Sequence, residues 1–348
     1  MNEIFKKQIE LNDKSDMKGS LQSFPDQIRE SFKIIEEYDF ILNTEINKII
    51  FLGMGGSAIG ADCVKSILNS CFEIPITICR SYEVPNWIDN NTLVIACSYS
   101  GNTEETLSAF SKCIERTSNI FSISTGGKLF SLSLEKNVSY LKLPKGFQPR
   151  AAIGFSIALN LLLLNKLKLI SNTFIGQISD HVQDLEDFSI SLFKDSNSAY
   201  LLAKNMVNRI PIIYGSCGFG DIIGLRFANQ LSENSKILSF SNSIPEQNHN
   251  EIEGWNKMNN YENKLCAIFI KDIDDNKQIL KRQNILSQII SSMKIDVFDL
   301  KVEHHIKSIR FLKFIHLVDC ISYYLAILRN INPTPVETIE EFKNSLSN

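Results

Sequence analysis

TLVIACSYSGNTEETLSAF, residues 92–110, contains three structural signals in succession. Residues 92–96 are an apolar, β-branched run typical of a buried strand, and residues 107–114 have the periodicity of a helix. Between them, residues 97–106 gather hydroxyl and amide side chains around a single glycine. The stretch therefore predicts a strand, a polar turn and a helix, the order from which α/β folds are built.

The polar turn allows two interpretations. Asn102 would serve as a helix N-cap with Glu105 three residues later, and Glu104 and Glu105 suit the positive end of the helix dipole. Alternatively, the turn wraps an anion, because a helix N-terminus presents unpaired backbone N–H groups and the neighbouring hydroxyls add neutral donors. This stretch alone favours neither interpretation over the other.

The same alternation of strand and helix extends along the chain. An amphipathic helix is expected over 21–45 and a longer one near 151–170. Apolar runs typical of strands occur at 46–52, 74–80, 92–96, 119–124, 138–143, 237–240, 265–270 and 294–300, and another opens the stretch 210–231. This pattern predicts parallel sheets covered by helices.

The chain also repeats itself. Residues 210–231 resemble 48–68 in their order of strand, glycine turn and helix, and a polar segment at 171–195 separates the halves. We expect two tandem α/β domains. The first spans 1–175 and includes an N-terminal helix, and the second spans 195–348 and closes with helices near 310–330 and 335–346.

Composition excludes several classes of function. The 348 residues are 44% hydrophobic and 22% charged, as in soluble globular proteins, and 36 basic residues face 39 acidic ones. This balance favours neither nucleic acid nor an anionic membrane. The eight cysteines include no CxxC pair, as is usual for reduced thiols. The N-terminus is polar and unlike a signal peptide, and the apolar run at 161–170 is too short to cross a bilayer. These observations predict a cytoplasmic protein.

The glycine cluster after residue 52 invites comparison with dinucleotide-binding proteins. Gly53, Gly55 and Ala58 fit the G-x-G-x-x-A fingerprint. However, the expected acidic residue should end the next strand, whereas Glu73 precedes that strand and Arg80 follows it. A dehydrogenase therefore stays only a lesser alternative, and a P-loop is excluded because no GKS or GKT follows the glycines.

Several segments in order resemble one family. They are GMGGSAIGAD (53–62), CSYSGNTEET (97–106), PRAAIG (149–154), ENSK (233–236), PEQNHNEIEGW (245–255) and SYYLAILRNINPTPVETIEEFKNSL (322–346). Together they are similar to the bifunctional phosphoglucose/phosphomannose isomerase family, a branch of the phosphoglucose isomerase superfamily built on tandem sugar isomerase (SIS) domains. Departures from the family pattern are small. Ala61 stands where the family usually has glycine, Ser232 stands where it usually has asparagine, and Gln247 lies within the PExNHN motif.

The resemblance assigns the polar turn to phosphate binding. It implies that the phosphate of the sugar binds Ser98, Ser100 and Thr103, with Gly56 and Ser57 beside them. Neutral hydroxyls and a helix dipole suffice to hold a phosphate while allowing product to leave. The anion interpretation of the opening turn is thereby favoured.

The resemblance also implies the residues that move protons. Glu233 would be the C2 base, Arg150 would stabilise the enediolate, and His249 with Lys343 would open the sugar ring. No metal or other cofactor is expected, since the His304–His305 pair lacks nearby cysteine or histidine partners.

The implied activity is the interconversion of glucose 6-phosphate and mannose 6-phosphate with fructose 6-phosphate. A homodimer with shared active sites is expected, in which His249 reaches the neighbouring chain from a polar, loop-like segment. The alternative from another class is a non-catalytic SIS protein that senses sugar phosphates. That alternative predicts a DNA-binding module, for which the 45 residues before the first strand are short.

Overall fold

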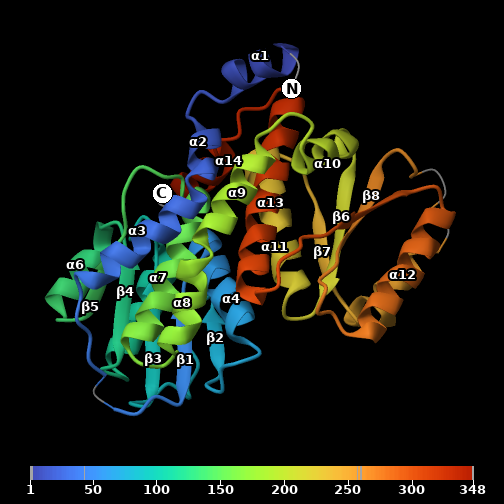
Figure 1. Cartoon of the computed structure of the whole chain (residues 1–348). Coiled ribbons are helices and arrows are strands. Elements are labelled where there is room, and N and C mark those ends of the chain that lie inside the picture. The colour runs from blue at the N-terminus through green and yellow to red at the C-terminus, as the bar shows by residue number, and fades with distance from the viewer. Residues whose placement is uncertain (1–2, 43, 257, 259–260, 347–348) are drawn as a thin grey trace. The chain divides into compact units, whose positions relative to one another are not determined.

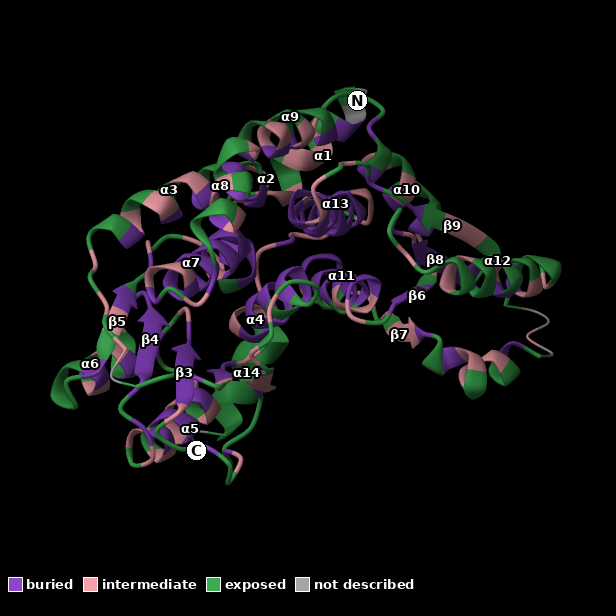
Figure 2. Ribbon diagram, turned by 60° about the horizontal axis from the view of Figure 1, so that its bottom comes forward, coloured by how far each residue is buried: buried purple, intermediate pink, exposed green. Residues whose placement is uncertain are grey.

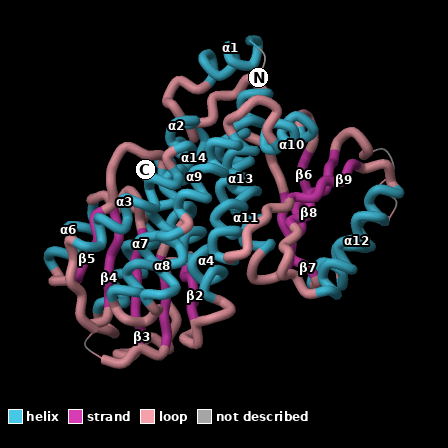
Figure 3. The backbone as a smooth tube through the Cα atoms, in the orientation of Figure 1, coloured by secondary structure: helices cyan, strands magenta, loops and turns pink. Residues whose placement is uncertain are grey.

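A computed structural model describes residues 3–42, 44–256, 258 and 261–346, which form two compact units (Figure 1). One unit is Ser23–Asp184, and the other joins residues 3–22 to residues 185–346. Each unit contains one parallel sheet with helices around it (Figure 3). The expected fold class, two mainly parallel sheets flanked by helices, is confirmed.

The sheet of the Ser23–Asp184 unit has five parallel strands in the order β2-β1-β3-β4-β5. They are β1 Lys48–Leu52, β2 Ile76–Cys79, β3 Thr92–Cys97, β4 Ile120–Ser124 and β5 Ser139–Lys142. Chain order runs outward in opposite directions from β1 and β3, which lie side by side in the sheet. The carboxyl ends of these two strands form a topological switch point, where open α/β sheets bind ligands.

Helices connect and cover these strands. They are α3 Phe24–Glu36, α4 Gly55–Leu68, α5 Glu104–Ile114, α6 Gly127–Glu135, η1 Pro149–Ala152, α7 Ile153–Lys166, α8 Asn172–Asp180 and α9 Val182–Leu192, the last crossing the boundary between units. Alternate strand residues such as Ile50 and Val94 form a buried core with Phe110 of α5 and Leu129 of α6. α4 packs on α7, and α7 packs on α3.

The other unit has four parallel strands in the order β7-β6-β8-β9. They are β6 Ile210–Ser216, β7 Phe240–Ile244, β8 Leu265–Ile270 and β9 Asp296–Leu300. The remaining elements are α1 Glu3–Asn12, α2 Met17–Gln22, α10 Ser198–Met206, α11 Gly220–Ser235, η2 Glu246–His249, η3 Glu251–Trp255, α12 Lys277–Ser292, α13 Lys307–Leu328 and α14 Glu337–Leu346. Tyr214, Phe269, Leu286 and Trp255 belong to its core.

Among the described residues, α13 is the single helix long and apolar enough to cross a bilayer. It is nevertheless a core helix, since its side chains are buried almost throughout (Figure 2). It also carries Arg310, His316 and Asp319 inside the unit, and Asp319 pairs with the buried Arg226 of α11 at 2.7 Å. Such polar contacts suit a helix buried in protein rather than in lipid.

The structure corrects the expected extent of the first domain. Residues 3–22 form α1 and α2, which pack on α13 and belong with the C-terminal unit instead of with 23–175. Phe5 inserts its ring beside Tyr200 and Tyr324, with centroids 4.9 and 5.9 Å away. The segment before residue 23 is mostly polar and has few apolar residues at helical spacing. Its sequence therefore gave little sign of this packing.

Two regions differ from the sequence prediction. Helices α8 and α9 occupy the polar segment 171–195, for which no helix was predicted, and Ser171 caps α8 by accepting from Phe174 N at 3.2 Å. The strand expected at 237–240 begins only at Phe240 and continues to Ile244. β7 is an edge strand with polar residues, whereas the apolar Leu238 before it is 70% exposed.

Candidate active site

The turn between β3 and α5 is held by its own hydroxyl groups. Ser98 Oγ lies 2.9 Å from Thr103 Oγ1 and accepts a hydrogen bond from Gly101 N at 3.1 Å. Ser100 Oγ accepts from Asn102 N at 3.2 Å. The side chains predicted to bind phosphate are therefore already arranged around the start of α5.

The helix cap differs from the one expected for Asn102. α5 begins at Glu104, so Thr103 is the N-cap residue, and its hydroxyl turns back to Ser98 instead of capping the first turn. Asn102 Oδ1 accepts from Lys128 N at 3.0 Å and so joins this turn to α6. The start of α5 thus keeps the uncapped N–H groups that suit an anion.

Gly101 has a steric reason to be glycine. Its φ of +69° lies in the left-handed region, and a Cβ there would come within 1.8 Å of Gly126 O. Since no side chain fits between these backbones, the turn after β3 packs directly on the turn after β4. The chain consequently fixes the position of the flanking Ser100 and Asn102.

The glycine turn after β1 lies against the segment that carries Arg150. A Cβ on Gly56 would lie 3.0 Å from Pro149 O, so α4 begins in close contact with η1. Gly56, Ser57, Pro149 and Tyr99 are among the residues that line one small pocket. Two of the predicted binding residues therefore share a pocket with the end of β3 and with η1.

Cys97 also lines this pocket but offers no nucleophile. Burial raises the pKa of its thiol to about 12, so the group is neutral near pH 7. Cysteine chemistry requires the thiolate. The polar side chains that line this pocket include the hydroxyls of Ser57 and Ser156 and the amide of Asn160.

Arg150 is held at the junction of η1 and α7, where it is 3% exposed. The side chain of Gln27, buried on α3, spans this junction: Nε2 donates to Ala151 O at 2.8 Å, and Oε1 accepts from Gly154 N at 3.0 Å. The backbone on the C-terminal side of Arg150 is therefore fixed by one amide. A buried guanidinium stays protonated and is suited to stabilising an oxyanion.

Glu233 lies near the C-terminal end of α11 and is half-buried. The next turn is closed by Lys236, whose φ is 53° and whose Nζ donates to Glu233 O and, at 3.3 Å, to Pro333 O. Arg329 donates to Ser235 O. These cations satisfy the carbonyls at the negative end of the helix and fix the backbone that carries Glu233.

The residues after Glu233 are locked onto α13. Asn234 Nδ2 donates to Ser322 Oγ at 2.9 Å, and Ser235 Oγ donates to Ser322 O at 2.6 Å. One turn from Ser322, Asp319 holds Arg226 of α11 through two hydrogen bonds of 2.9 and 2.7 Å. α11 is thus attached to α13 along its length, which gives a carboxylate at its end a defined position.

His249 and Lys343 stand on two other elements of the same unit. His249 is exposed at the end of η2, which follows the cis bond Ile244–Pro245. Lys343 is exposed on α14, where Phe342 and Leu346 are also 64% and 63% exposed. The three residues predicted to transfer protons thus come from α11, η2 and α14.

Comparison with known proteins agrees with these motifs. Residues 195–346 match the model of the bacterial phospho-glucose isomerase C-terminal SIS domain. A bifunctional phosphoglucose/phosphomannose isomerase of Caldicellulosiruptor bescii is 35% identical over 334 residues, covering 94% of this chain and 98% of its own length. The chain belongs to the bifunctional phosphoglucose/phosphomannose isomerase family.

A second family member extends the comparison. The enzyme of that name from Aquifex aeolicus is 33% identical and covers 92% of this chain and 99% of its own length. Among solved structures, a protein of Thermus thermophilus superposes with a TM-score of 0.74 at 14% identity, covering 99% of this chain and 93% of its own. This structural similarity concerns the fold alone.

The two repeats of this family member differ at the turn that would bind phosphate. In the second repeat, β8 is followed by Asp272, Asp274 and Asp275, where β3 is followed by serine and threonine. Arg310 of α13 pairs with the carboxylates of Asp272 and Asp274. Burial raises the pKa of Asp275. An acidic turn whose arginine is already paired is less suited to a phosphate dianion than the hydroxyl turn after β3.

Two residues near the site were not predicted from the sequence. Gln27 is one of them. A polar glutamine on the apolar face of the 21–45 helix was the feature of the sequence that could have indicated it. Tyr99 is the other: its Oη donates to Pro144 O at 3.0 Å and accepts from Phe147 N at 3.1 Å. It ties the loop before Arg150 to the turn after β3. An aromatic residue within an otherwise polar turn was its sequence signal.

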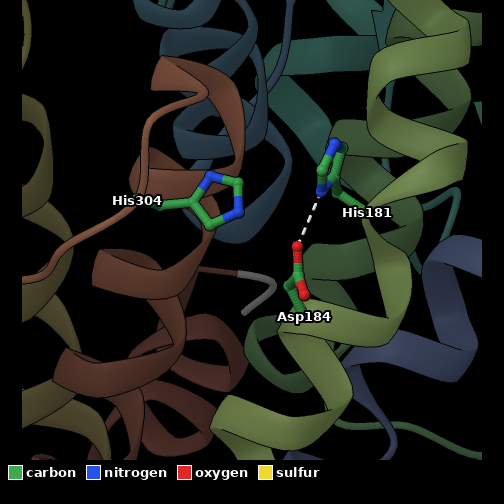
Figure 4. A group of neighbouring side chains, drawn as sticks. All are labelled: His181, Asp184 and His304. Carbon is green, nitrogen blue, oxygen red and sulfur yellow. Dashed lines mark hydrogen bonds and ion pairs between the residues drawn. The ribbon is translucent and has the colours of Figure 1, made fainter.

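One further histidine of the Ser23–Asp184 unit has a local role. His181 Nδ1 hydrogen-bonds Asp184 Oδ2 at 2.6 Å, across the short turn between α8 and α9 (Figure 4). Both side chains lie at the ends of helices, where such a bond fixes the turn. We assign this pair to the helix connection.

Proposed function

We propose that this protein interconverts glucose 6-phosphate and mannose 6-phosphate with fructose 6-phosphate, as the names of its relatives from Caldicellulosiruptor bescii and Aquifex aeolicus describe. The observation that carries the proposal is the preformed hydroxyl turn of Ser98 and Thr103 at the switch point of the first sheet. Its donors are neutral, and the helix behind it supplies the positive end of a dipole.

The phosphate anchors the sugar while other groups act on the opposite end. In our proposal the phosphate accepts hydrogen bonds from Ser98, Ser100, Thr103 and the N–H groups that begin α5, with Gly56 and Ser57 beside it. Hydroxyls and amides bind a dianion without a full countercharge. Product release is thereby easier than from a cluster of lysines and arginines.

Isomerisation then needs ring opening and a proton transfer between C1 and C2. We assign ring opening to His249 and Lys343, because an imidazole and an ammonium can exchange protons with the ring oxygen and the anomeric hydroxyl. Glu233 takes the C2 proton of the aldose, and the electron pair moves to the carbonyl oxygen to give the enediolate. Arg150 stabilises that oxyanion. The proton of the O2 hydroxyl then passes to O1 as Glu233 returns its proton to C1, which leaves the carbonyl at C2.

Glucose and mannose 6-phosphates differ only in configuration at C2. Both give the same enediolate once the C2 proton is removed, and rotation about C2–C3 presents either face to Glu233. One base is therefore sufficient for both substrates, and the reaction balances without an oxidant, a reductant or a metal. A cytoplasmic location belongs to the same proposal.

The dehydrogenase alternative is disfavoured by the pairing of Arg80. Its guanidinium forms an ion pair with Asp62 of α4, so the cation that would meet a 2′-phosphate is already occupied. The sensing alternative is disfavoured because residues 3–22 pack as two short helices on α13 instead of forming a separate module.

The direct test is a coupled assay with each hexose 6-phosphate, run with and without a chelator. Turnover of both aldoses that is indifferent to chelation supports the proposal. Activity that requires a nicotinamide cofactor, or saturable binding of these sugars without turnover, would contradict it.

Assembly is the second part of the proposal. We propose a homodimer in which His249 of each chain serves the neighbouring active site, since His249 is exposed and α14 presents apolar side chains to solvent. Inactive Glu233→Gln protein mixed with inactive His249→Ala protein should then regain partial activity, because a mixed dimer has one intact site. Demonstrated subunit exchange without recovered activity would place His249 with its own chain.

A further inference from the structure

We infer that Glu251 is a positioning residue that fixes the loop of His249. The inference rests on the proposed role of His249 in ring opening. Glu251 begins η3, two residues after His249. Its carboxylate accepts from Tyr214 Oη at 2.5 Å and from Asn242 Nδ2 at 2.6 Å.

The two donors to Glu251 lie side by side on neighbouring strands of the sheet. Tyr214 of β6 and Asn242 of β7 are direct partners in the parallel register, so both side chains meet the carboxylate of Glu251 together. Tyr214 is fully buried, and its Oη accepts from Trp255 Nε1 at 2.9 Å. Glu251 is consequently joined to two neighbouring strands and, through Tyr214, to the far end of η3.

Asn250 completes the attachment on the side of His249. Its Oδ1 accepts from Glu251 N at 2.6 Å, and its Nδ2 donates to Glu246 Oε1 at 2.9 Å. The backbone on both sides of His249 is thereby tied down while its imidazole stays exposed. A proton donor on a loop acts efficiently only when the loop is ordered, since misplacement by about 1 Å can cost about a hundredfold in rate.

The chemistry of the contact explains why a carboxylate stands at this position. Two donors converge on the side chain, and an ionised carboxylate accepts both in charge-assisted hydrogen bonds. A glutamine at position 251 would turn its NH2 toward the NH2 of Asn242. Asn242 Oδ1 cannot easily turn instead, because it accepts from Ser243 N at 2.8 Å.

This arrangement allows a test by exchange of the two side chains. Glu251→Gln leaves two amide donors facing each other, and Asn242→Asp leaves two carboxylates facing each other. The double variant Asn242→Asp/Glu251→Gln restores one donor and one acceptor, with Tyr214 still donating to residue 251. Glu253→Gln is the matched control, since this exposed acid of η3 contacts Asn256 at 3.0 Å.

We expect each single exchange to lower kcat about tenfold or more and to increase amide hydrogen exchange over 245–256. The double variant should recover most of both properties, and Glu253→Gln should match the parent. Inhibition by inorganic phosphate, which reports on the Ser98–Thr103 turn, should stay constant throughout. Single variants with parental kcat, or a double variant no better than the singles, would overturn the inference.

His249→Ala separates this inference from the proposed function. If His249→Ala is inactive while the single exchanges keep parental turnover, Glu251 has no positioning role although His249 acts as proposed. If His249→Ala itself keeps parental turnover, the role proposed for His249 fails and the inference fails with it.

Discussion

The hydroxyl oxygens of Ser98 and Thr103 lie 2.9 Å apart and close the turn between β3 and α5. This contact draws the N-cap residue of α5 back to the end of β3, so the hydroxyls and the first-turn N–H groups surround one position. This contact and the hydrogen bond from Gly101 N to Ser98 Oγ hold the turn in one form. Binding a phosphate there requires little reorganisation, which is the condition for useful affinity from neutral donors.

Removing single hydroxyls from this turn should weaken substrate binding first. We expect Ser100→Ala and Thr103→Ala each to raise KM about fivefold, the equivalent of about 1 kcal/mol, with a smaller effect on kcat. Steady-state kinetics with inorganic phosphate as a competitive inhibitor measures this. Ser108→Ala, a half-buried residue of α5 whose hydroxyl donates to Tyr82 O at 3.2 Å, is the control. An unchanged KM in Thr103→Ala would mean that phosphate binds elsewhere.

Replacing Gln27 should impair catalysis through Arg150. Gln27→Leu leaves Ala151 O and Gly154 N without their partner, so η1 and α7 can shift relative to each other. We expect kcat to fall about tenfold while KM changes little. Ser31→Ala is the control, because Ser31 is buried one turn later on the same helix and its hydroxyl donates to Gln27 O at 2.7 Å.

Thermal unfolding must accompany the Gln27 measurement. Buried backbone groups left unpaired cost about 1–3 kcal/mol each, so Gln27→Leu is also expected to be less stable. If the folded fraction retains the parental kcat, Gln27 only stabilises the fold.

Each chain should bind one sugar phosphate despite its two repeats. The turn after β8 carries Asp272 and Asp274, paired with Arg310, in place of hydroxyls. Calorimetric titration of fructose 6-phosphate into Glu233→Gln protein, which avoids turnover, should give one site per chain. Two equivalent sites per chain would show that the acidic turn binds phosphate after all.

The sequence predicted the strands and the polar turns well for a physical reason. β3 and β8 are fully buried, so each reads as an unbroken apolar run bounded by polar residues. β7 was misplaced because an edge strand needs no such run, and FSNSI is held mainly by the backbone ladder. The helices α8 and α9 were missed because only a few of their positions are buried.

The residues of the candidate site likewise fall into those that the sequence predicted and those that it did not. Residues proposed to contact the substrate directly, such as Ser100 and Glu233, occur in recognisable motifs. Gln27 and Tyr99 bond the backbone of other segments, and Glu251 bonds side chains of two strands. Most of these partners are far away in sequence, and a single sequence carries no record of such contacts. The cap interpretation of Asn102 was open because its partner, Lys128 N, lies 26 residues later, beyond the local pattern.

Acid should destabilise the protein through His316. Burial lowers the pKa of this imidazole to about 3, whereas the unfolded chain would protonate it near 6.5. The unfolded state therefore binds more protons between these values, so this contribution to stability is complete above pH 6.5 and decreases as the pH falls toward 3. The expected loss is about 1.4 kcal/mol per pH unit below 6.5.

His316→Gln isolates this contribution. The amide can still reach Ser189 Oγ, which lies 2.9 Å from His316 Nε2, but it does not titrate. Urea unfolding at pH 7.5 and 5.5 should show a change in stability smaller by about 1.4 kcal/mol in the variant than in the parent. Equal changes in both proteins would indicate that His316 is accessible to protons in the folded state.

Glu233→Gln tests the central claim most directly, because the amide keeps the shape of the side chain but cannot accept the C2 proton. The measurement is isomerisation of glucose 6-phosphate and mannose 6-phosphate beside calorimetric binding of fructose 6-phosphate. We predict a loss of turnover of about 10² to 10⁴ with both aldoses, while sugar-phosphate binding stays close to that of the parent. Near-parental turnover with either aldose would contradict the account, since another group would then remove the proton.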